Sequence, residues 1–235
     1  MSKGVKELQG SPRSLLSVRV RPPHVSGAAA ACAKEGLDAG ASGVHSAAMT
    51  TLVRPATIAD AARLSRLGAT MFRQTFEGEN TPDDLARYLA EAFTPDRQAA
   101  EITDPGGTVL VAERGGQSGD TELVGYVHLV SGPAPAAVEG PAPLELKRLY
   151  VARACHGQGV AQALMDAALD AARARGAQTM WLGVWERNPR AVAFYRKYGF
   201  TRVGEHTFML GADAQTDWVL ARPLRTAPPS HHEIP

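Results

Sequence analysis

The spacing of apolar residues along the chain changes repeatedly between a strand pattern and a helix pattern. Short apolar or alternating runs are typical of strands, and apolar residues three or four apart are typical of helices. We expect strands at residues 52–54, 108–113, 123–131, 144–151, 179–184, 201–205 and 217–220. We expect helices at residues 58–72, 81–93, 157–175 and 189–198, with another short helix starting at Thr94. Because strands and helices alternate in the second half, the pattern predicts an α/β fold, a mixed sheet with helices on both faces.

The first 48 residues follow neither period and are rich in Ala, Gly, Ser and Pro. They carry six basic and three acidic side chains, and they lack the continuous apolar segment that a secretory signal needs. We expect residues 1–48 to be a disordered extension, or to precede a translation start at Met49. The folded domain is expected at residues 49–226, followed by a tail at residues 227–235.

Composition excludes several classes of function. The chain has 25 basic and 24 acidic residues, a balance that gives no support for a nucleic-acid binder. Its two cysteines, Cys32 and Cys155, provide neither a disulfide framework nor metal-ligand spacing. No apolar run approaches the roughly 18 residues of a membrane helix. We expect a soluble cytoplasmic protein without a metal, nucleic-acid or membrane partner, and we leave a homodimer open.

Residues 156–161 read His-Gly-Gln-Gly-Val-Ala, between an expected strand and an expected helix. Glycines keep side chains out of such a turn, so consecutive backbone N–H groups can approach a ligand. The helix start adds further unpaired N–H groups and the positive end of its dipole. The longer nucleotide-binding patterns are missing, since there is no Lys-Ser/Thr pair and no third glycine. The turn therefore predicts a phosphate site made by His156, Gly157, Gln158, Gly159, Val160 and Ala161.

A second motif follows the next expected strand. Asn188-Pro189 opens a helix that ends Phe194-Tyr195-x-x-x-Gly199-Phe200. A glycine turn, a strand, an Asn and this helix, in that order, resemble the GNAT family of N-acetyltransferases over residues 51–224. The family's turn usually reads Gln/Arg-x-x-Gly-x-Gly/Ala, so His156 departs from it; we expect this to be tolerated because backbone amides grip the phosphate. The resemblance implies a mostly antiparallel GNAT-fold sheet and acetyl-CoA as cosubstrate, with its pyrophosphate on the turn.

Acetyl transfer to an amine requires a proton acceptor for the amine and a proton donor for the departing thiolate. The resemblance gives Tyr195 the donor role, although Tyr195 could instead belong to the packed face of its helix, where Phe194 and Tyr198 fit better. The resemblance also makes Glu145 the candidate base, because it lies eleven residues before His156, the separation at which histone-type members of the family carry a catalytic Glu. The alternatives are ordered waters as the base, with Glu145 merely paired to a neighbouring Lys147 or Arg148.

Other residues have weaker assignments. The resemblance implies that main-chain groups of Leu149, Tyr150 and Val151 pair with the pantetheine arm, and that Asn188 contacts this arm. Asn188 is also a natural N-cap before Pro189. Four basic residues around this helix fit the adenosine 3′-phosphate or plain surface solvation equally well: Arg187, Arg190, Arg196 and Lys197. Nothing marks Cys155 as a nucleophile, and we expect His206 to be structural.

The acceptor is suggested by charge and by a narrower resemblance. Residues 77–104 hold eight acidic and only two basic side chains, an acidic wall that would attract a cationic amine. Residues 72–76, 203–211 and 213–217 resemble the bacterial polyamine acetyltransferase branch. We therefore expect spermidine or spermine as the acceptor. The alternatives are a protein, peptide or antibiotic amine, and a non-catalytic acetyl-CoA sensor.

Overall fold

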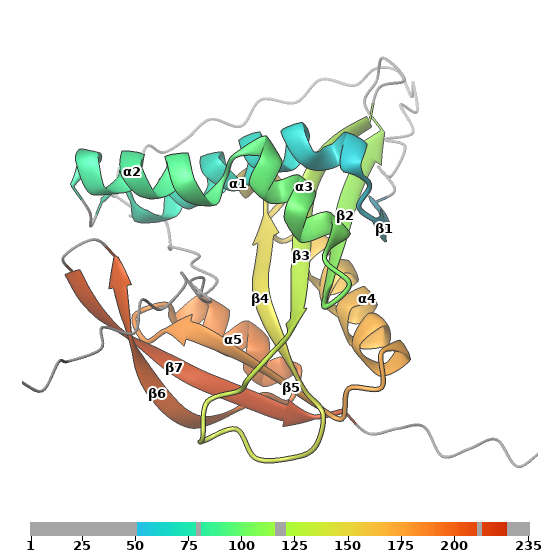
Figure 1. Ribbon diagram of the computed structural model, residues 1–235, viewed down its shortest axis with the longest axis vertical. Helices are drawn as coiled ribbons and strands as arrows, with labels where there is room; N and C mark the ends of the chain where they lie inside the picture. Colours follow the sequence, from blue (N-terminus) through green and yellow to red (C-terminus); the bar gives the residue numbers. More distant parts are fainter. Residues whose placement is uncertain (1–50, 79–80, 116–120, 211–212, 225–235) are drawn as a thin grey trace, which may run out of the picture.

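The structure is a computed structural model, and it describes residues 51–78, 81–115, 121–210 and 213–224. The expected extension at residues 1–48 and the tail at residues 227–235 lie outside the described residues. A seven-stranded sheet in the order β1-β2-β3-β4-β5-β7-β6 crosses the molecule (Figure 1). Its strands are β1 (Thr51–Pro55), β2 (Gly107–Gly115), β3 (Thr121–Ser131), β4 (Pro143–Val151), β5 (Thr179–Trp185), β6 (Thr201–Leu210) and β7 (Asp213–Pro223). The helices are α1 (Ala61–Phe76), α2 (Pro82–Ala92), α3 (Pro95–Thr103), α4 (Val160–Ala174) and α5 (Pro189–Lys197), with 3₁₀ turns at Ile58–Asp60 and Arg153–Cys155.

Every expected element is confirmed, with shifted boundaries. β6 and β7 are longer than predicted because they form one antiparallel pair that continues to Leu210 and Asp213. Helix α4 begins at Val160, later than predicted, because Gly157 and Gly159 adopt left-handed conformations that a helix cannot include. Thr94 caps α3 as expected, since its hydroxyl accepts a hydrogen bond from the backbone N–H of Arg97.

The sheet is mixed and mostly antiparallel, as predicted. Its single parallel pair joins β4 and β5, and their register covers only Pro143–Glu145 against Thr179–Trp181. Beyond Glu145 and Trp181 the two strands point apart, which is visible in Figure 1. The sheet therefore opens between β4 and β5 towards their carboxyl ends.

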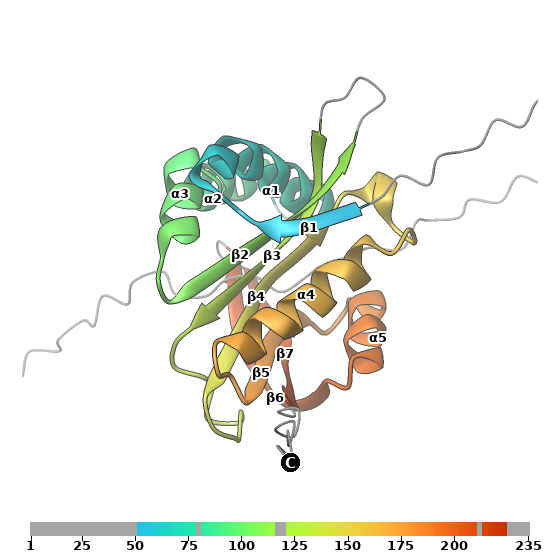
Figure 2. The same ribbon diagram turned by 90° about the vertical axis from the view of Figure 1, so that its right-hand side faces the viewer.

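Helices cover both faces of the sheet, also as predicted. Figure 2 shows α1, α2 and α3 on one side and α4 and α5 on the other. The α4 side holds the main core, in which Leu164, Met165 and Ala168 are completely buried. A second core lies under α1–α3 around Phe72 and Tyr126. No helix in the described ranges is long and apolar enough to cross a membrane.

A β-bulge in β4 sets which side chains face each core. His128 on β3 pairs with Arg148, and the next β3 residue pairs with Leu146, so Lys147 is an extra residue. As a result, Leu146 and Leu149 both belong to the α4-side core, although they are three residues apart. Tyr150 belongs to the core under α1–α3.

Candidate active site

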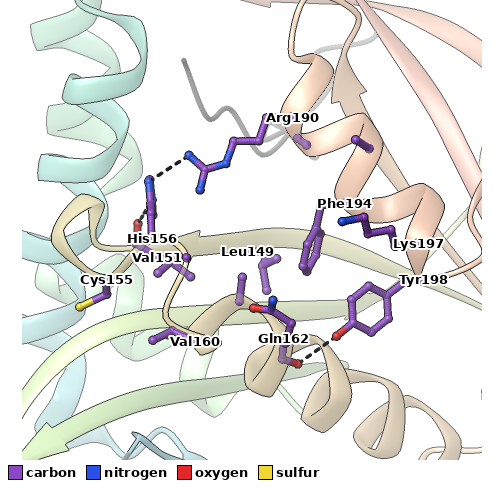
Figure 3. Close-up of a pocket in the computed structure, with 15 residues that line it drawn as sticks. Leu149, Val151, Cys155, His156, Val160, Gln162, Arg190, Phe194, Lys197 and Tyr198 are labelled. Atoms are coloured by element: carbon purple, nitrogen blue, oxygen red, sulfur yellow. Dashed lines mark hydrogen bonds between the residues drawn. The ribbon is translucent and has the colours of Figure 1, made fainter. Parts of the chain in front are cut away.

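A cavity of about 370 Å³ lies where the end of β4, the start of α4 and one side of α5 meet (Figure 3). It is lined by Leu149, Val151, Cys155, His156, Gly157, Gly159, Val160, Ala161, Gln162, Arg190, Ala191, Ala193, Phe194, Lys197 and Tyr198. The structure thus brings together most of the predicted phosphate turn and the predicted end of β4. The two segments meet because β4 runs directly into the turn.

Backbone geometry makes the turn suitable for an anion. Gly157 has a φ of 75° and Gly159 a φ of 83°, and a Cβ at either position would meet no neighbouring atom. The surface above these two glycines is therefore open. The first hydrogen bond of α4 runs from the N–H of Ala163 to the carbonyl of Gly159, so the N–H groups of residues 160–162 precede the helical ladder. These donors and the positive helix end are directed at the cavity.

His156 holds the turn against β4. Its Nε2 lies 3.0 Å from the carbonyl oxygen of Val151, and its Nδ1 lies 3.4 Å from Nη1 of Arg190 (Figure 3). Since a carbonyl only accepts, Nε2 carries the proton and Nδ1 is left to accept from Arg190. Burial, followed by the nearby cations Arg190 and Arg153, lowers the pKa of His156 despite the opposing effect of the Val151 carbonyl. A neutral His156 therefore fits this position, which explains the departure from the usual Gln or Arg.

Arg114, near the end of β2, holds the glycine turn in place through Cys155 and Gln158. Its guanidinium donates to the side-chain oxygen of Gln158 and, at 3.4 Å, to the Gln158 carbonyl, and it also contacts the sulfur of Cys155. The Gln158 side chain donates in turn to the carbonyl of Ala154 at 2.7 Å. Gln158 therefore secures the turn and does not line the cavity. The sequence analysis did not find Arg114, because its partners are more than forty residues away in sequence.

Helix α5 forms the opposite wall of the cavity. Phe194 and Tyr198 face the cavity, and the Tyr198 hydroxyl donates to the carbonyl of Gln162 at 3.4 Å. Burial, and then Asp166, raises the pKa of Tyr198 to about 12. Two of the four basic residues that the sequence left unassigned, Arg190 and Lys197, line the cavity, and together with the helix end they make it attractive to phosphate groups.

Tyr195 lies deeper than the cavity lining. Its side chain is completely buried in the main core, against Phe194 and Phe200. The sequence favoured Phe194 and Tyr198 as the packed residues of this helix. In the structure these two line the cavity, and Tyr195 is the core residue. The Tyr195 hydroxyl is buried and makes no hydrogen bond to any described residue. Burial raises its pKa, so the phenol stays protonated.

The other predicted residues lie close to the opening between β4 and β5. Tyr150 points away from the cavity, into the core under α1–α3, although its hydroxyl still interacts electrostatically with that of Tyr195. Asn188 is buried, and its side-chain oxygen accepts the N–H of Ala191 at 3.1 Å, so its capping role is confirmed. Glu145 is half-buried and pairs in register with Trp181, at the last position before the strands part.

The acidic segment proves to have mixed roles. Glu101 is buried and forms a two-pronged ion pair with Arg148, which is itself 3% exposed. It therefore does not belong to a solvent-facing acidic wall. His128 lies 3.7 Å from this carboxylate, but burial and then the cations Arg148, Lys147 and Arg97 hold its pKa well below the ordinary value. The Glu101 carboxylate does not offset this effect, because Arg148 already neutralises it.

Comparisons with known proteins show which family and fold the chain is similar to. The family model described as "Acetyltransferase (GNAT) family" matches residues 70–200. The chain is 34% identical over 165 residues to an uncharacterized N-acetyltransferase of Mycobacterium tuberculosis, covering 70% of this chain and 98% of the relative. It is also 34% identical over 153 residues to an uncharacterized N-acetyltransferase of Lactobacillus delbrueckii subsp. lactis, covering 65% and 86%.

Two solved structures show the same fold. One is the PaiA N-acetyltransferase from Thermoplasma acidophilum in complex with coenzyme A, with a TM-score of 0.55, 18% identity, and coverage of 74% of this chain and 99% of that chain. The other is a putative acetyltransferase from Salmonella typhimurium with its cofactor acetyl-CoA, with a TM-score of 0.52, 21% identity, and coverage of 77% and 99%. At these identities the likeness concerns the fold alone.

Proposed function

Because the chain belongs to the GNAT family of acetyltransferases, we propose that it acetylates a small polycationic amine such as spermidine or spermine. The chain is an N-acetyltransferase, and acetyl-CoA is its cosubstrate. The acceptor, the residues that act on it and the residues that hold the cofactor are inferred from this chain's own side chains.

The proposed cofactor site rests on one observation, the cavity in which the glycine turn, the end of β4 and α5 meet. The pyrophosphate would accept hydrogen bonds from the N–H groups of residues 157–161, with Arg190 and Lys197 adding positive charge. The pantetheine arm would run along Leu149, Tyr150 and Val151, where β4 has left β5 and can pair with a ligand through its main chain. Asn188 at the start of α5 would border this arm.

The proposed proton donor is Tyr195. A raised pKa keeps its hydroxyl protonated, and the hydroxyl makes no hydrogen bond to a described residue, so it is available to a thiolate. For the proton acceptor, Glu145 is one candidate and ordered waters are the other. Lys147 lies close enough to Glu145 to interact with it electrostatically.

The proposed acceptor is supported by the exposed members of the acidic segment. Glu77, Asp83 and Glu91 are exposed on and beside α1 and α2, whereas Glu101 is already neutralised by Arg148. Exposed carboxylates raise the local concentration of a polycation and are sensitive to salt. The narrower resemblance of residues 72–76 and 203–217 to polyamine acetyltransferases adds a second, partly independent reason.

The deciding experiment compares specificity constants for spermidine, an aminoglycoside and a lysine peptide, measured as thiol release from acetyl-CoA. We expect spermidine to have the highest kcat/KM. Neutralising Glu77, Glu79, Asp83 and Asp84 should raise the KM for spermidine and weaken its salt dependence, with the KM for acetyl-CoA unchanged as the control. A preference for the peptide or the aminoglycoside would reject the polyamine. Binding of acetyl-CoA without thiol release for any amine would favour the sensor.

A further inference from the structure

The half of the sheet formed by β5, β7 and β6 carries a side-chain pair that the proposed mechanism has not used. The register places His206 on β6 directly opposite Asp217 on β7, and Asp217 directly opposite Trp185 on β5. Directly paired residues of antiparallel strands project from the same face, with Cβ atoms about 5 Å apart. Val219 and Trp181 belong to this face as well, on the side of the sheet away from the α4-side core. His206 and Asp217 are therefore neighbours on the face opposite the α4-side core, where Ala134 and Val138 of the segment between β3 and β4 pack against Trp181, Val219 and Ala221.

The side chains of His206 and Asp217 both extend over Gly183 of β5. A Cβ at Gly183 would lie 3.0 Å from Cε1 and 3.6 Å from Nε2 of His206, and 3.7 Å from Oδ2 of Asp217. The imidazole and the carboxylate thus share the space that the absent side chain leaves. Gly183 is two residues beyond Trp181, the last residue of β5 that pairs with β4. The pair consequently lies beside the start of the opening between β4 and β5.

The surroundings of His206 suit a proton acceptor. Its side chain is half-buried, its Nδ1 is buried without a hydrogen-bond partner among the described residues, and burial lowers its pKa. Asp217 is only 2% exposed. The other titratable groups that β4 presents on this side of the sheet are Glu145, Lys147, Arg148 and Tyr150, and Arg148 is already paired with Glu101 of α3. A neutral imidazole in this setting can accept a proton, and the Asp217 carboxylate shares the space above Gly183 with it without forming an ion pair with His206 in the described structure.

We propose that His206 accepts the proton of the acceptor ammonium group, and that Asp217 acts through His206 as a positioning residue. This inference rests on the proposed transfer to an amine. The N–H bond of the ammonium breaks and its proton moves to His206; the freed lone pair then attacks the thioester carbonyl carbon. The N–C bond forms and the C–S bond breaks. The donor protonates the departing sulfur, so that coenzyme A leaves as a thiol, the second proton of the nitrogen returns to the donor, and His206 releases its proton to solvent. Gly183 is the residue that leaves room for the imidazole.

The test compares His206→Gln and Asp217→Asn with Glu205→Gln as a matched control. Glu205 is the preceding residue of the same strand, and its exposed side chain pairs with Arg202 instead. With spermidine near pH 7, we expect His206→Gln to lower kcat/KM by about a hundredfold or more, Asp217→Asn by less, and Glu205→Gln not at all. The KM for acetyl-CoA should not change in any variant.

The pH profile separates a base from a structural residue. The defect of His206→Gln should shrink as the pH rises towards the amine's pKa of about 10, because more of the acceptor is then already neutral. A peptide α-amino group, with a pKa of about 8, should suffer a smaller defect at pH 7 than a lysine-type amine. Gly183→Ala, which crowds the imidazole, should give a milder version of the same profile.

Different outcomes would reject the proposed acetyl transfer and the proposed role of His206. A wild-type protein that acetylates no amine would reject the proposed function, and this inference with it. A wild-type protein that acetylates spermidine, with a His206→Gln variant that is equally active or equally impaired at every pH, would reject the role of His206 alone. Unchanged melting temperatures would establish that the variants are folded. If His206→Gln is unstable, the pH profile of Gly183→Ala tests the role of His206 in its place.

Discussion

At the residue scale, Tyr195 illustrates how a buried hydroxyl can be useful because it lacks a protein partner. Burying a hydroxyl without a hydrogen bond costs on the order of 1–3 kcal/mol in proteins. Tyr195 is completely buried, and its hydroxyl finds no partner among the described residues. The aromatic ring alone would pack equally well as phenylalanine. The hydroxyl therefore points to a requirement outside the core itself.

Tyr195→Phe tests this requirement. We expect kcat to fall by about a hundredfold, because only the proton donor is lost, while the KM for acetyl-CoA stays nearly unchanged. The melting temperature should stay equal or rise, since an unpaired polar group is removed. Steady-state kinetics and thermal unfolding of the same preparation provide both readings. Tyr198→Phe, which removes the hydroxyl at the cavity surface, is the matched control and should retain most of its kcat.

Sequence alone could place these residues along the chain but could not assign their depth. The helical spacing favoured Phe194 and Tyr198 as the packed residues, whereas the structure buries Tyr195 completely. Which of them faces the core depends on how α5 is rotated against the sheet, which is decided by contacts with distant residues such as Phe200. His206 was predicted to be structural for the same reason: its proximity to Asp217 and Gly183 is a property of strand register.

At the element scale, the glycine turn depends on both local and long-range features. The glycine turn and the helix after it are local features that the sequence predicted from residue types, although the helix starts at Val160 and not at Gly157 as expected. The support from Arg114 comes from a distant strand, and it could not be predicted because nothing near Arg114 in sequence marks it. The sequence could not predict that β4 and β5 part beyond Glu145 either, since both strands keep their apolar pattern after they part.

Gly159→Asp and Gly159→Asn separate charge from backbone strain in the turn. Asn and Asp tolerate the left-handed conformation to a similar degree and have nearly the same shape. The Asp variant should raise the KM for acetyl-CoA well above that of the Asn variant, because only its side chain repels the pyrophosphate. High salt should narrow the difference. Equal KM values for the two variants would show that the turn does not face a phosphate.

Arg114→Gln tests the support beneath the turn. We expect a severalfold higher KM for acetyl-CoA with little change in kcat, because the variant loosens Gln158 and removes a nearby positive charge without touching the reacting groups. Isothermal titration with coenzyme A should show the same loss of affinity. Arg175→Gln is a suitable control, since Arg175 contacts carbonyl groups at the opposite end of α4. A fall in kcat at unchanged affinity would contradict the assigned role.

At the scale of the whole molecule, the opening between β4 and β5 joins two faces that differ in chemistry. The α4 and α5 side offers helix N–H groups and cations, as a phosphorylated cofactor requires. The opposite side offers His206 and Asp217 on β6 and β7, and α1 and α2 add exposed carboxylates, as a cationic amine requires. In the proposed arrangement the two substrates approach from opposite faces, and the thioester meets the amine in the opening.

The buried charges on the α1–α3 side also determine how the fold responds to acid. His128 is 2% exposed, and burial together with neighbouring cations keeps it neutral in the folded state, whereas an unfolded chain protonates it below a pKa of 6.5. The unfolded state therefore binds more protons as the pH falls through this value, and stability is lost. The carboxylates of Asp60 and Glu113, whose pKa values are lowered by Arg54, lose their contribution only at lower pH, below about 4.

We therefore expect the free energy of unfolding to fall between about pH 7.5 and pH 5.5, with each buried histidine contributing at most about 1.4 kcal/mol per pH unit below 6.5. His128→Gln removes one titrating group, so its stability should depend less steeply on pH in this window, even if it is less stable at pH 7.5. Urea unfolding at several pH values measures both slopes. Between about pH 7.5 and 9 the free energies of unfolding of the wild type and the variant should change equally with pH, because His128 does not titrate there. Equal slopes below pH 6.5 would mean that His128 is already protonated in the fold, and that Glu101 stabilises His128 as well as Arg148.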